Sequence, residues 1–212
     1  MSGSLVSPAT RQRVRDLATP VARALGRLGL TPNGLTVAGF LGTGIAALAA
    51  AGQAWLVAGV LVLAFGIFDL FDGSLARATG RVSTFGAFLD STLDRAGEAV
   101  VYVGIAAGAL IAGFDATVIL AATAMAAAFL VSYVRAKAES LGYAPGSGLM
   151  NVGLAPREVR IVILAAGLLV AGLGAPGPGI DALTLALGLI SILATVTTIQ
   201  RILHVRAQSR EG

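Results

Sequence analysis

The chain has 212 residues, of which 56% are apolar, 28 are glycine and 12% are charged. Soluble domains carry about 25% charged residues, so this composition excludes an ordinary soluble protein, and the absence of cysteine excludes a disulfide scaffold. The net charge of +4 fits the basic loops of a membrane protein better than it fits nucleic-acid binding.

Apolar stretches along the chain predict an all-α integral membrane protein with six transmembrane helices. A transmembrane helix needs about 20 residues, so a chain of this length has room for roughly six or seven. The predicted helices cover residues 34–51, 54–76, 85–112, 117–134, 159–174 and 182–203. Nothing in the sequence indicates a repeat or a second domain. Residues 1–212 are therefore predicted to form one domain, with the membrane bundle over 34–207.

The segment 8–30 differs from these stretches. Its apolar residues recur at helical spacing with arginines between them, and Ser7 and Pro8 are suitable residues to begin a helix. This pattern predicts an amphipathic helix that lies on the cytoplasmic leaflet. A disordered basic tail is the alternative.

The positions of the basic residues predict the topology. Every lysine and arginine except Arg95 lies in the N-terminal segment, the second–third loop, the fourth–fifth loop or the C-terminal end. The other connections carry charge only at Asp115 and Asp181. By the positive-inside rule, both termini face the cytoplasm. The chain is thus predicted to be a multi-pass protein of the cell (inner) membrane.

Four aspartates lie within the predicted spans. Asp69 and Asp72 come late in the second helix, and Asp90 and Asp94 lie four residues apart on one face of the third. A short loop joins these two helices, so we expect them to be antiparallel neighbours. Asp72 and Asp90 then lie about 9 Å below the loop, and the other pair lies about 13–15 Å below it. The four carboxylates are predicted to converge in one pocket that opens to the cytoplasm.

Four converging carboxylates require counter-charge, either protons or divalent cations. Oxygen ligands suit Mg²⁺, Mn²⁺ or Ca²⁺, and two Mg²⁺ ions would balance the four charges. Two metals held by oxygen ligands indicate phosphoryl or pyrophosphate chemistry. Gly73 and Ala76 share the aspartate face and leave room for a bulky ligand, although close helix packing would also explain them. Arg77 is placed to hold phosphate.

The segment reads Asp69-x2-Asp72-Gly73-x2-Ala76-Arg77-x8-Gly86-x3-Asp90-x3-Asp94. It resembles, at every fixed position, the signature of the CDP-alcohol phosphatidyltransferases. That family transfers a phosphatidyl group from CDP-diacylglycerol to an alcohol and releases CMP.

The resemblance implies roles for particular residues. The four aspartates would hold two Mg²⁺ ions, with Mn²⁺ as a substitute, and Asp94 would also act as general base. The stretch Thr31-Pro32-Asn33-Gly34-Leu35-Thr36 resembles the segment that begins the family's first helix, near the nucleotide. The CDP-lipid contacts implied in this way are Pro32, Asn33, Thr36, Gly73, Ala76, Arg77, Ser83 and Gly86. The family also implies a homodimer.

Basic residues near the predicted cytoplasmic end bear on the acceptor alcohol. The expected acceptor contacts are Ser132, Arg135, Arg157, Arg160 and Arg201. Arginines around one pocket suit an acceptor that already carries phosphate, although each one also fits the positive-inside pattern. The run Ser132-Tyr133-Val134-Arg135-Ala136-Lys137-Ala138-Glu139 is similar to the branch of the family that makes phosphatidylinositol phosphate. Inositol phosphate is therefore the expected acceptor.

Other functions remain open from the sequence alone. Within the family, glycerol 3-phosphate is the second choice of acceptor and serine is the third. A different class, an ion-coupled transporter, would also explain intramembrane carboxylates, but it predicts charges near the middle of the membrane and access from both sides. A catalytically silent relative would be expected to lack some of the four aspartates.

Overall fold

The computed structural model describes residues 20–21, 24, 26–143, 149, 152–174 and 178–210, apart from the side chains at 67, 69, 70, 72 and 178–180. In this part of the chain the regular structure is helical and no strand occurs. The helices are α2 (Pro32–Ala51), α3 (Trp55–Ala78), α4 (Thr84–Ile111), α5 (Asp115–Ser140), α6 (Arg157–Leu173) and α7 (Pro178–Gln208). A helix therefore occupies each of the predicted apolar stretches. The predicted amphipathic helix over 8–30 lies largely outside the described residues.

Two helices are longer than hydropathy predicted. α5 continues to Ser140 rather than ending near residue 134, and α7 extends beyond both of its predicted ends. The extra turns of α5 contain good helix formers, and Arg135 donates to Glu139 at 2.9 Å, four residues later. Hydropathy marks where a chain leaves an apolar layer, whereas the helix itself continues into the polar region.

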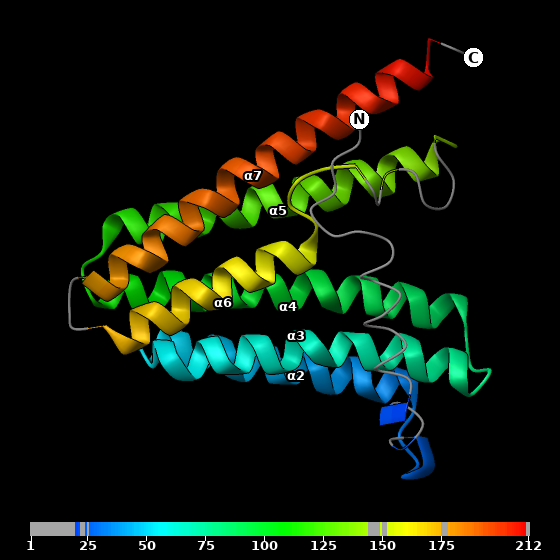
Figure 1. Ribbon diagram of the computed structural model, residues 1–212, viewed down its shortest axis with the longest axis horizontal. Helices are drawn as coiled ribbons and strands as arrows, with labels where there is room; N and C mark the ends of the chain where they lie inside the picture. Colours follow the sequence, from blue (N-terminus) through cyan, green and yellow to red (C-terminus); the bar gives the residue numbers. More distant parts are fainter. Residues whose placement is uncertain are drawn as a thin grey trace.

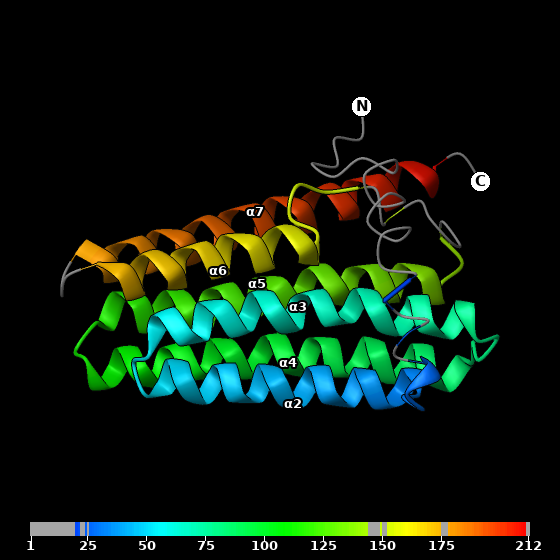
Figure 2. The same ribbon diagram turned by 60° about the horizontal axis from the view of Figure 1, so that its bottom comes forward.

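The helices form a closed ring. Each one packs against two neighbours, in the order α2, α4, α5, α7, α6, α3 and back to α2. They run side by side along the long axis of the molecule (Figures 1 and 2). The C-terminal ends of α3 and α5 lie at the same end of the ring as the N-terminal ends of α2 and α4, α7 ends on the same side, and α6 begins farther inward along the bundle (Figure 1). This end of the ring, which we call the basic end, carries Arg77 and Arg81 near the end of α3, Arg135 and Lys137 near the end of α5, and Arg206 near the end of α7.

Small residues allow the helices to approach closely. A Cβ atom added at Gly104 or Gly108 of α4 would overlap the backbone oxygens of Ala47 and Ala50 on α2. Such small-residue contacts are typical of helix packing in membranes, where close van der Waals contact drives association. The remaining interior is filled by buried side chains such as Ile105, which is fully buried.

We predicted that α3 and α4 are antiparallel neighbours, and the structure confirms the direction but not the packing. The two helices run antiparallel, but each packs against α2 and they do not form a packed pair with each other. The connecting residues 79–83 are long enough to separate the two helix ends, and α2 holds both helices from one side. The gap leaves space at the basic end between the two helices that carry the aspartates.

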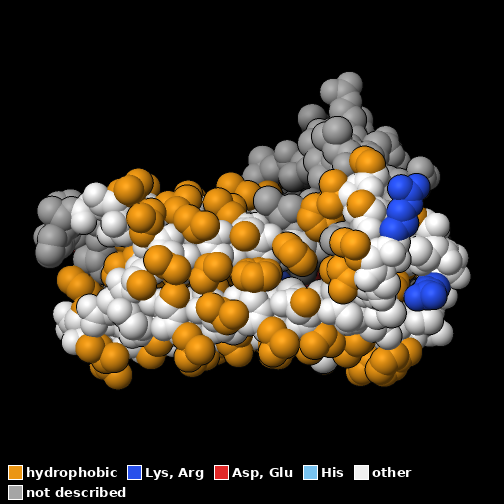
Figure 3. Space-filling view, turned by 90° about the horizontal axis from the view of Figure 1, so that it is seen from below, with side chains coloured by type: hydrophobic (Ala, Val, Ile, Leu, Met, Phe, Trp, Pro, Cys, Tyr) orange, Lys and Arg blue, Asp and Glu red, His pale blue; other side chains and the backbone are white. Residues whose placement is uncertain are grey.

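Membrane-spanning character is clear for part of the bundle. Among the described residues, three helices are long and apolar enough to cross a membrane: Pro32–Ala51, Asp115–Ser140 and Asp181–Gln208. α6, with 17 residues, is shorter than the about 20 residues of a usual membrane span, and α3 and α4 carry charged residues near the basic end. On the face seen in Figure 3, hydrophobic side chains cover most of the length, and the visible basic side chains lie at one end. These features define a membrane-embedded protein.

Candidate active site

A cavity of about 300 Å³ opens between α2, α3 and α4 at the basic end. It is lined by Pro32, Asn33, Thr36, Gly73, Ala76, Arg77, Arg81, Val82, Ser83, Gly86, Ala87 and Asp90. Every residue that the family resemblance implied for CDP-lipid binding is in this set. The structure therefore brings together, from three helices, residues that lie as far apart as 32 and 86 in the sequence.

Two helix caps shape the mouth of this cavity. The Thr31 hydroxyl accepts a hydrogen bond from the Gly34 amide at 3.1 Å and begins α2, with Pro32 in its first turn. The Ser83 hydroxyl accepts in the same way from the Gly86 amide at 3.0 Å and begins α4. Each hydroxyl satisfies a backbone N–H that has no partner within its helix. The caps fix two helix N-termini at the cavity, where their dipoles favour an anion.

Glycines leave the cavity open. A Cβ atom added at Gly86 would lie 3.0 Å from Ser83 Oγ and 3.1 Å from Asn33 Oδ1. A Cβ added at Gly73 would lie 3.5 Å from Arg77 Nη1, so this guanidinium lies over the glycine. Arg77 also donates to Ser74 Oγ at 3.3 Å. A phosphate group would thus find a guanidinium and a surface free of side chains at the same place.

Two of the predicted aspartates, Asp90 and Asp94, continue inward from this cavity along α4. Asp90 lines the cavity, and Asp94 lies one turn deeper on α4. On α3, residue 72 lies six positions before the last helical residue, and on α4, residue 90 lies six positions after the first. The two helices therefore carry these positions at matching heights, as predicted. The side chains of Asp69 and Asp72 lie outside the described residues, and among the described side chains no group of three or more metal-ligating residues occurs.

The residues present fit a hard divalent metal and a diphosphate. Asp90 supplies carboxylate oxygens at the cavity wall, the glycines provide a cradle that a Cβ would fill, and an arginine faces the same space. Oxygen donors of this type suit Mg²⁺ or Mn²⁺ rather than zinc.

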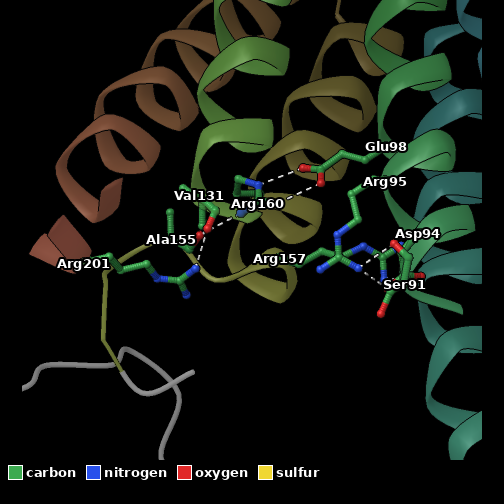
Figure 4. Close-up of polar contacts among 9 residues, drawn as sticks. All are labelled: Ser91, Asp94, Arg95, Glu98, Val131, Ala155, Arg157, Arg160 and Arg201. Carbon is green, nitrogen blue, oxygen red and sulfur yellow. Dashed lines mark hydrogen bonds and ion pairs between the residues drawn. The ribbon is translucent and has the colours of Figure 1, made fainter. Parts of the chain in front are cut away.

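Asp94 is in contact with two arginines. Arg157 of α6 places Nη1 3.1 Å from Asp94 Oδ1, and Arg95 places Nη1 3.6 Å from Asp94 Oδ2. Arg95 also donates to the backbone oxygen of Ser91 at 2.8 Å. Figure 4 shows both guanidinium groups beside the Asp94 carboxylate. Nearby guanidinium groups stabilise negative charge on a carboxylate.

Three further arginines, Arg135, Arg160 and Arg201, lie close enough to interact electrostatically with Arg95, Arg157 or one another. The charges of Arg135 and Arg157 both act on Arg95, and those of Arg135, Arg160 and Arg95 act on Arg201. We call these five residues the arginine cluster. Asp94, Glu98 and Glu139 are carboxylate partners of this cluster. A group of five guanidinium side chains suits a phosphorylated ligand.

Two members of the cluster are buried. Arg201 is 5% exposed and donates to the backbone oxygens of Val131 at 2.7 Å and Val152 at 3.1 Å. It therefore lies next to Ser132, another predicted acceptor contact, on α5. Arg160 is 2% exposed, and all three of its guanidinium nitrogens have protein partners, namely Glu98 and the backbone oxygen of Ala155. The partly exposed members are Arg95, Arg135 and Arg157.

The sequence interpretation missed several residues of these sites. Arg81 and Val82 line the cavity, and Arg95 and Glu98 contact the predicted site residues. Arg81 follows α3 by only a few residues, so its basic charge near Arg77 was a usable signal. The partner of Glu98 lies 62 residues away on another helix, and no local pattern predicts such a pair.

A helical bundle embedded in a membrane, with a cavity lined by Arg77 and Asp90, fits a membrane-bound enzyme that acts on phosphorylated lipids. A family model described as CDP-alcohol phosphatidyltransferase matches residues 29–202. The chain belongs to the CDP-alcohol phosphatidyltransferase family.

Relatives with known names cover nearly the whole chain. An archaetidylinositol phosphate synthase of Pyrococcus horikoshii is 36% identical over 95% of this chain and 97% of its own length. A phosphatidylinositol phosphate synthase of Cutibacterium acnes is 39% identical over 88% of this chain and 91% of its own.

The fold also matches solved structures. The phosphatidylinositol phosphate synthase of Mycobacterium tuberculosis with CDP-DAG bound gives a TM-score of 0.78 at 30% identity, over 90% of this chain and 94% of that one. The same enzyme in complex with manganese and citrate gives a TM-score of 0.77 at 30% identity, over 89% and 88% of the two chains.

Proposed function

We propose that this enzyme transfers the phosphatidyl group of CDP-diacylglycerol to inositol phosphate, giving phosphatidylinositol phosphate and CMP. The observation that carries the proposal is the 3.1 Å contact between Arg157 and Asp94. It joins the arginine cluster, which suits the phosphate of an acceptor, to the carboxylate that would take the proton from the acceptor hydroxyl. The phosphatidylinositol phosphate synthases among the relatives support the same acceptor.

The CDP-lipid would bind in the cavity between α2, α3 and α4. Arg77 would hold the diphosphate, and the caps at Thr31 and Ser83 would direct two helix N-termini toward it. The lining residues proposed to contact the CDP-lipid are Pro32, Asn33, Thr36, Gly73, Ala76, Arg77, Ser83 and Gly86. A cavity of about 300 Å³ is at the lower end of the usual size for a small-molecule site, which suits the polar head of the lipid rather than its chains.

Asp69, Asp72, Asp90 and Asp94 would hold two Mg²⁺ ions, for which Mn²⁺ would substitute. When bound, the metals neutralise the diphosphate and stabilise charge on the CMP leaving group. The manganese complex of the Mycobacterium tuberculosis enzyme supports a divalent metal at such a site.

Asp94 is the proposed general base. It would accept the proton of the acceptor hydroxyl while the hydroxyl oxygen forms a bond to the phosphorus of the phosphatidyl group. The bond from that phosphorus to the bridging oxygen of CMP breaks, and CMP leaves with the electron pair. Before this step, Arg157 would hold the phosphate of the acceptor within one side-chain length of Asp94. This contact would orient the acceptor hydroxyl for attack.

Ser132, Arg135, Arg157 and Arg201 are the proposed contacts of the acceptor. Arg160, the fifth residue predicted for this site, would support it without touching the acceptor, because its guanidinium is fully partnered within the protein. Arg135 and Arg157 are partly exposed and suited to direct phosphate contact. Ser132 lies next to the backbone contact that Arg201 makes with Val131.

The acceptor can be tested by supplying purified enzyme in lipid vesicles with CDP-diacylglycerol and Mg²⁺, then adding inositol phosphate, glycerol 3-phosphate or serine separately. We expect CMP release with inositol phosphate and little with the other two. A preference for glycerol 3-phosphate would identify a phosphatidylglycerophosphate synthase instead. A preference for serine would contradict the proposal that the arginine cluster binds a phosphate group of the acceptor.

The membrane placement is proposed from the ring of helices and its charges. All six helices would cross the cell (inner) membrane, as a single domain, with both termini and the active site on the cytoplasmic side. An amphipathic helix over 8–30 would lie on the same leaflet. Because the chain has no cysteine, single cysteines at Arg81 and at Asp115 can be compared for reaction with an impermeant maleimide applied from the outside of intact cells. We expect labelling only at Asp115→Cys, and the reverse would invert the topology.

A homodimer is proposed from the family resemblance. Light scattering on the detergent-solubilised enzyme, corrected for bound detergent, should give twice the mass of the 21.2 kDa chain. A monomeric mass would reject this assembly.

A further inference from the structure

A buried ion pair crosses the interior of the helix ring. Arg160 of α6 donates from Nε to Glu98 Oε1 at 2.8 Å and from Nη2 to Glu98 Oε2 at 2.7 Å. The side chains are 2% and 9% exposed. α4 and α6 are not a packed pair in the ring, so the two long side chains bridge helices whose backbones are apart. A bidentate arginine–carboxylate pair also fixes orientation.

The same arginine holds the segment that leads into α6. Arg160 Nη1 donates to the backbone oxygen of Ala155 at 2.9 Å. The Thr197 hydroxyl on α7 accepts from the backbone amides of Leu154 at 3.0 Å and Ala155 at 2.9 Å. Gly153 next to them has φ +121°, and a Cβ there would overlap Thr197 Cγ2. The segment just before Pro156 is therefore held from α6 and from α7.

The pair between Arg160 and Glu98 lies one turn from the contact between Arg157 and Asp94. Residues 94 and 98 are four apart on α4, and residues 157 and 160 are three apart on α6, so each pair of side chains shares one helix face. Figure 4 shows the two bridges side by side between the helices. The inner bridge is buried, whereas Arg157 is 22% exposed and Asp94 15% exposed.

We propose that Glu98, Arg160 and Thr197 are positioning residues that set the first turn of α6, so that Arg157 reaches both Asp94 and the acceptor. None of the three would touch the substrates. The fully partnered guanidinium of Arg160 gives it this role in place of a direct acceptor contact. This inference rests on the proposed acceptor site, and it predicts defects in acceptor use when the inner bridge or the linker contact is weakened.

The test compares Glu98→Gln and Thr197→Val with a matched control, Thr195→Val. Thr195 is two residues from Thr197 on α7, and its hydroxyl donates only within its own helix, to the Ser191 backbone oxygen at 2.8 Å. We expect Glu98→Gln to raise the KM of the acceptor by about tenfold or more, and Thr197→Val by about threefold or more, as expected for lost hydrogen bonds to charged and neutral groups. The KM of CDP-diacylglycerol should stay within about twofold for all three variants, because none of them removes a contact to that lipid. A twofold change corresponds to less free energy than the loss of one hydrogen bond.

A structural role alone would give another result. It would lower the thermal stability of Glu98→Gln and Thr197→Val and leave the acceptor KM of the folded enzyme unchanged, or it would change both KM values equally. Either outcome would overturn the proposal. Thr197→Val keeps the test informative if Glu98→Gln does not fold, because it replaces a hydroxyl by a methyl group of similar size and leaves the ion pair intact.

A measurement without any acceptor separates this inference from the choice of acceptor. Spin labels at Thr92→Cys on α4 and Glu158→Cys on α6 report on the first turn of α6, since the chain has no other cysteine. We expect the distance distribution to broaden or shift in Glu98→Gln and to remain unchanged in Thr195→Val. An unchanged distribution in Glu98→Gln would contradict the positioning role, whichever alcohol proves to be the substrate.

Discussion

Arg157 of α6 lies 3.1 Å from Asp94 of α4. One turn farther along each helix, Arg160 and Glu98 form a second bridge between residues that are 62 apart in the sequence. The contact between Arg157 and Asp94 connects the two candidate binding sites. On one side of Asp94 is the cavity that suits a CDP-lipid, and on the other is the arginine cluster. A phosphorylated acceptor bound to Arg157 would present its hydroxyl to the carboxylate, so this contact leads to most of the predictions below.

Replacing Asp94 by asparagine removes the proposed base without changing the size of the side chain. We expect CMP release to fall by at least about 10²- to 10⁴-fold, the usual contribution of a general base. Binding of CDP-diacylglycerol should persist, because the cavity and most of the carboxylates remain. Calorimetry with the lipid and a CMP assay measure the two effects separately. Asp115→Asn, at the opposite end of the ring, is the matched control, and wild-type turnover in Asp94→Asn would remove the assigned role.

Replacing Arg157 by alanine should raise the acceptor KM by about 10- to 100-fold, the range expected for losing a charge-assisted hydrogen bond. The KM of CDP-diacylglycerol should change far less, since Arg157 does not line that cavity. Lys137→Ala removes a positive charge from the exposed side of α5 and serves as the control. If the two variants have the same acceptor kinetics, Arg157 serves topology alone.

Gly86→Ala tests the cavity between α2, α3 and α4. The added methyl group would lie 3.0 Å from Ser83 Oγ and 3.1 Å from Asn33 Oδ1, which is too close for an unstrained contact. Overpacking costs about 1–3 kcal/mol, so we expect the KM of CDP-diacylglycerol to rise by at least about fivefold. Gly44→Ala is the control, because a Cβ there would meet no atom within 4 Å. Equal kinetics in the two variants would place the lipid head elsewhere.

Chelation of divalent metal should abolish activity, and Mg²⁺ or Mn²⁺ should restore it, because carboxylate oxygens bind these ions and the diphosphate needs counter-charge. The measurement is CMP release after treatment with EDTA and re-addition of each metal. Calcium is an informative comparison, since it takes more ligands at longer distances. Turnover in the complete absence of metal would contradict the proposed two-metal site.

Much of the fold was predictable from the sequence because apolar periodicity and loop charge are local signals. α2 begins at Pro32 behind its Thr31 cap, and α4 begins at Thr84 behind its Ser83 cap, each close to the predicted start. Hydropathy failed at the end of α5, where Arg135 and Glu139 extend the helix beyond the apolar residues. It also gave no sign that α2 separates α3 from α4, since helix order in a ring depends on which small residues meet.

In the candidate site too, some residues could be predicted from the sequence and others could not. The residues proposed to bind the CDP-lipid could be chosen from the sequence, because Gly73, Ala76, Arg77 and Gly86 belong to the family motif and Pro32, Asn33 and Thr36 to a second family-like segment. The structure gathers these residues around one cavity. The role of Arg160 could not be predicted in this way, because a basic residue near a helix start looks the same whether it faces a substrate or a buried carboxylate. Its bond to Glu98 depends on how α6 lies across the ring from α4, which only the tertiary structure defines.

The most direct test of the account compares inositol phosphate with inositol as acceptors for the wild-type enzyme, at fixed CDP-diacylglycerol and Mg²⁺. The two alcohols differ only in the phosphate group that the arginine cluster is proposed to bind. We predict that kcat/KM is higher for inositol phosphate by at least about 100-fold, and that Arg157→Ala removes most of the difference. Equal kcat/KM values for the two alcohols would contradict the proposed function.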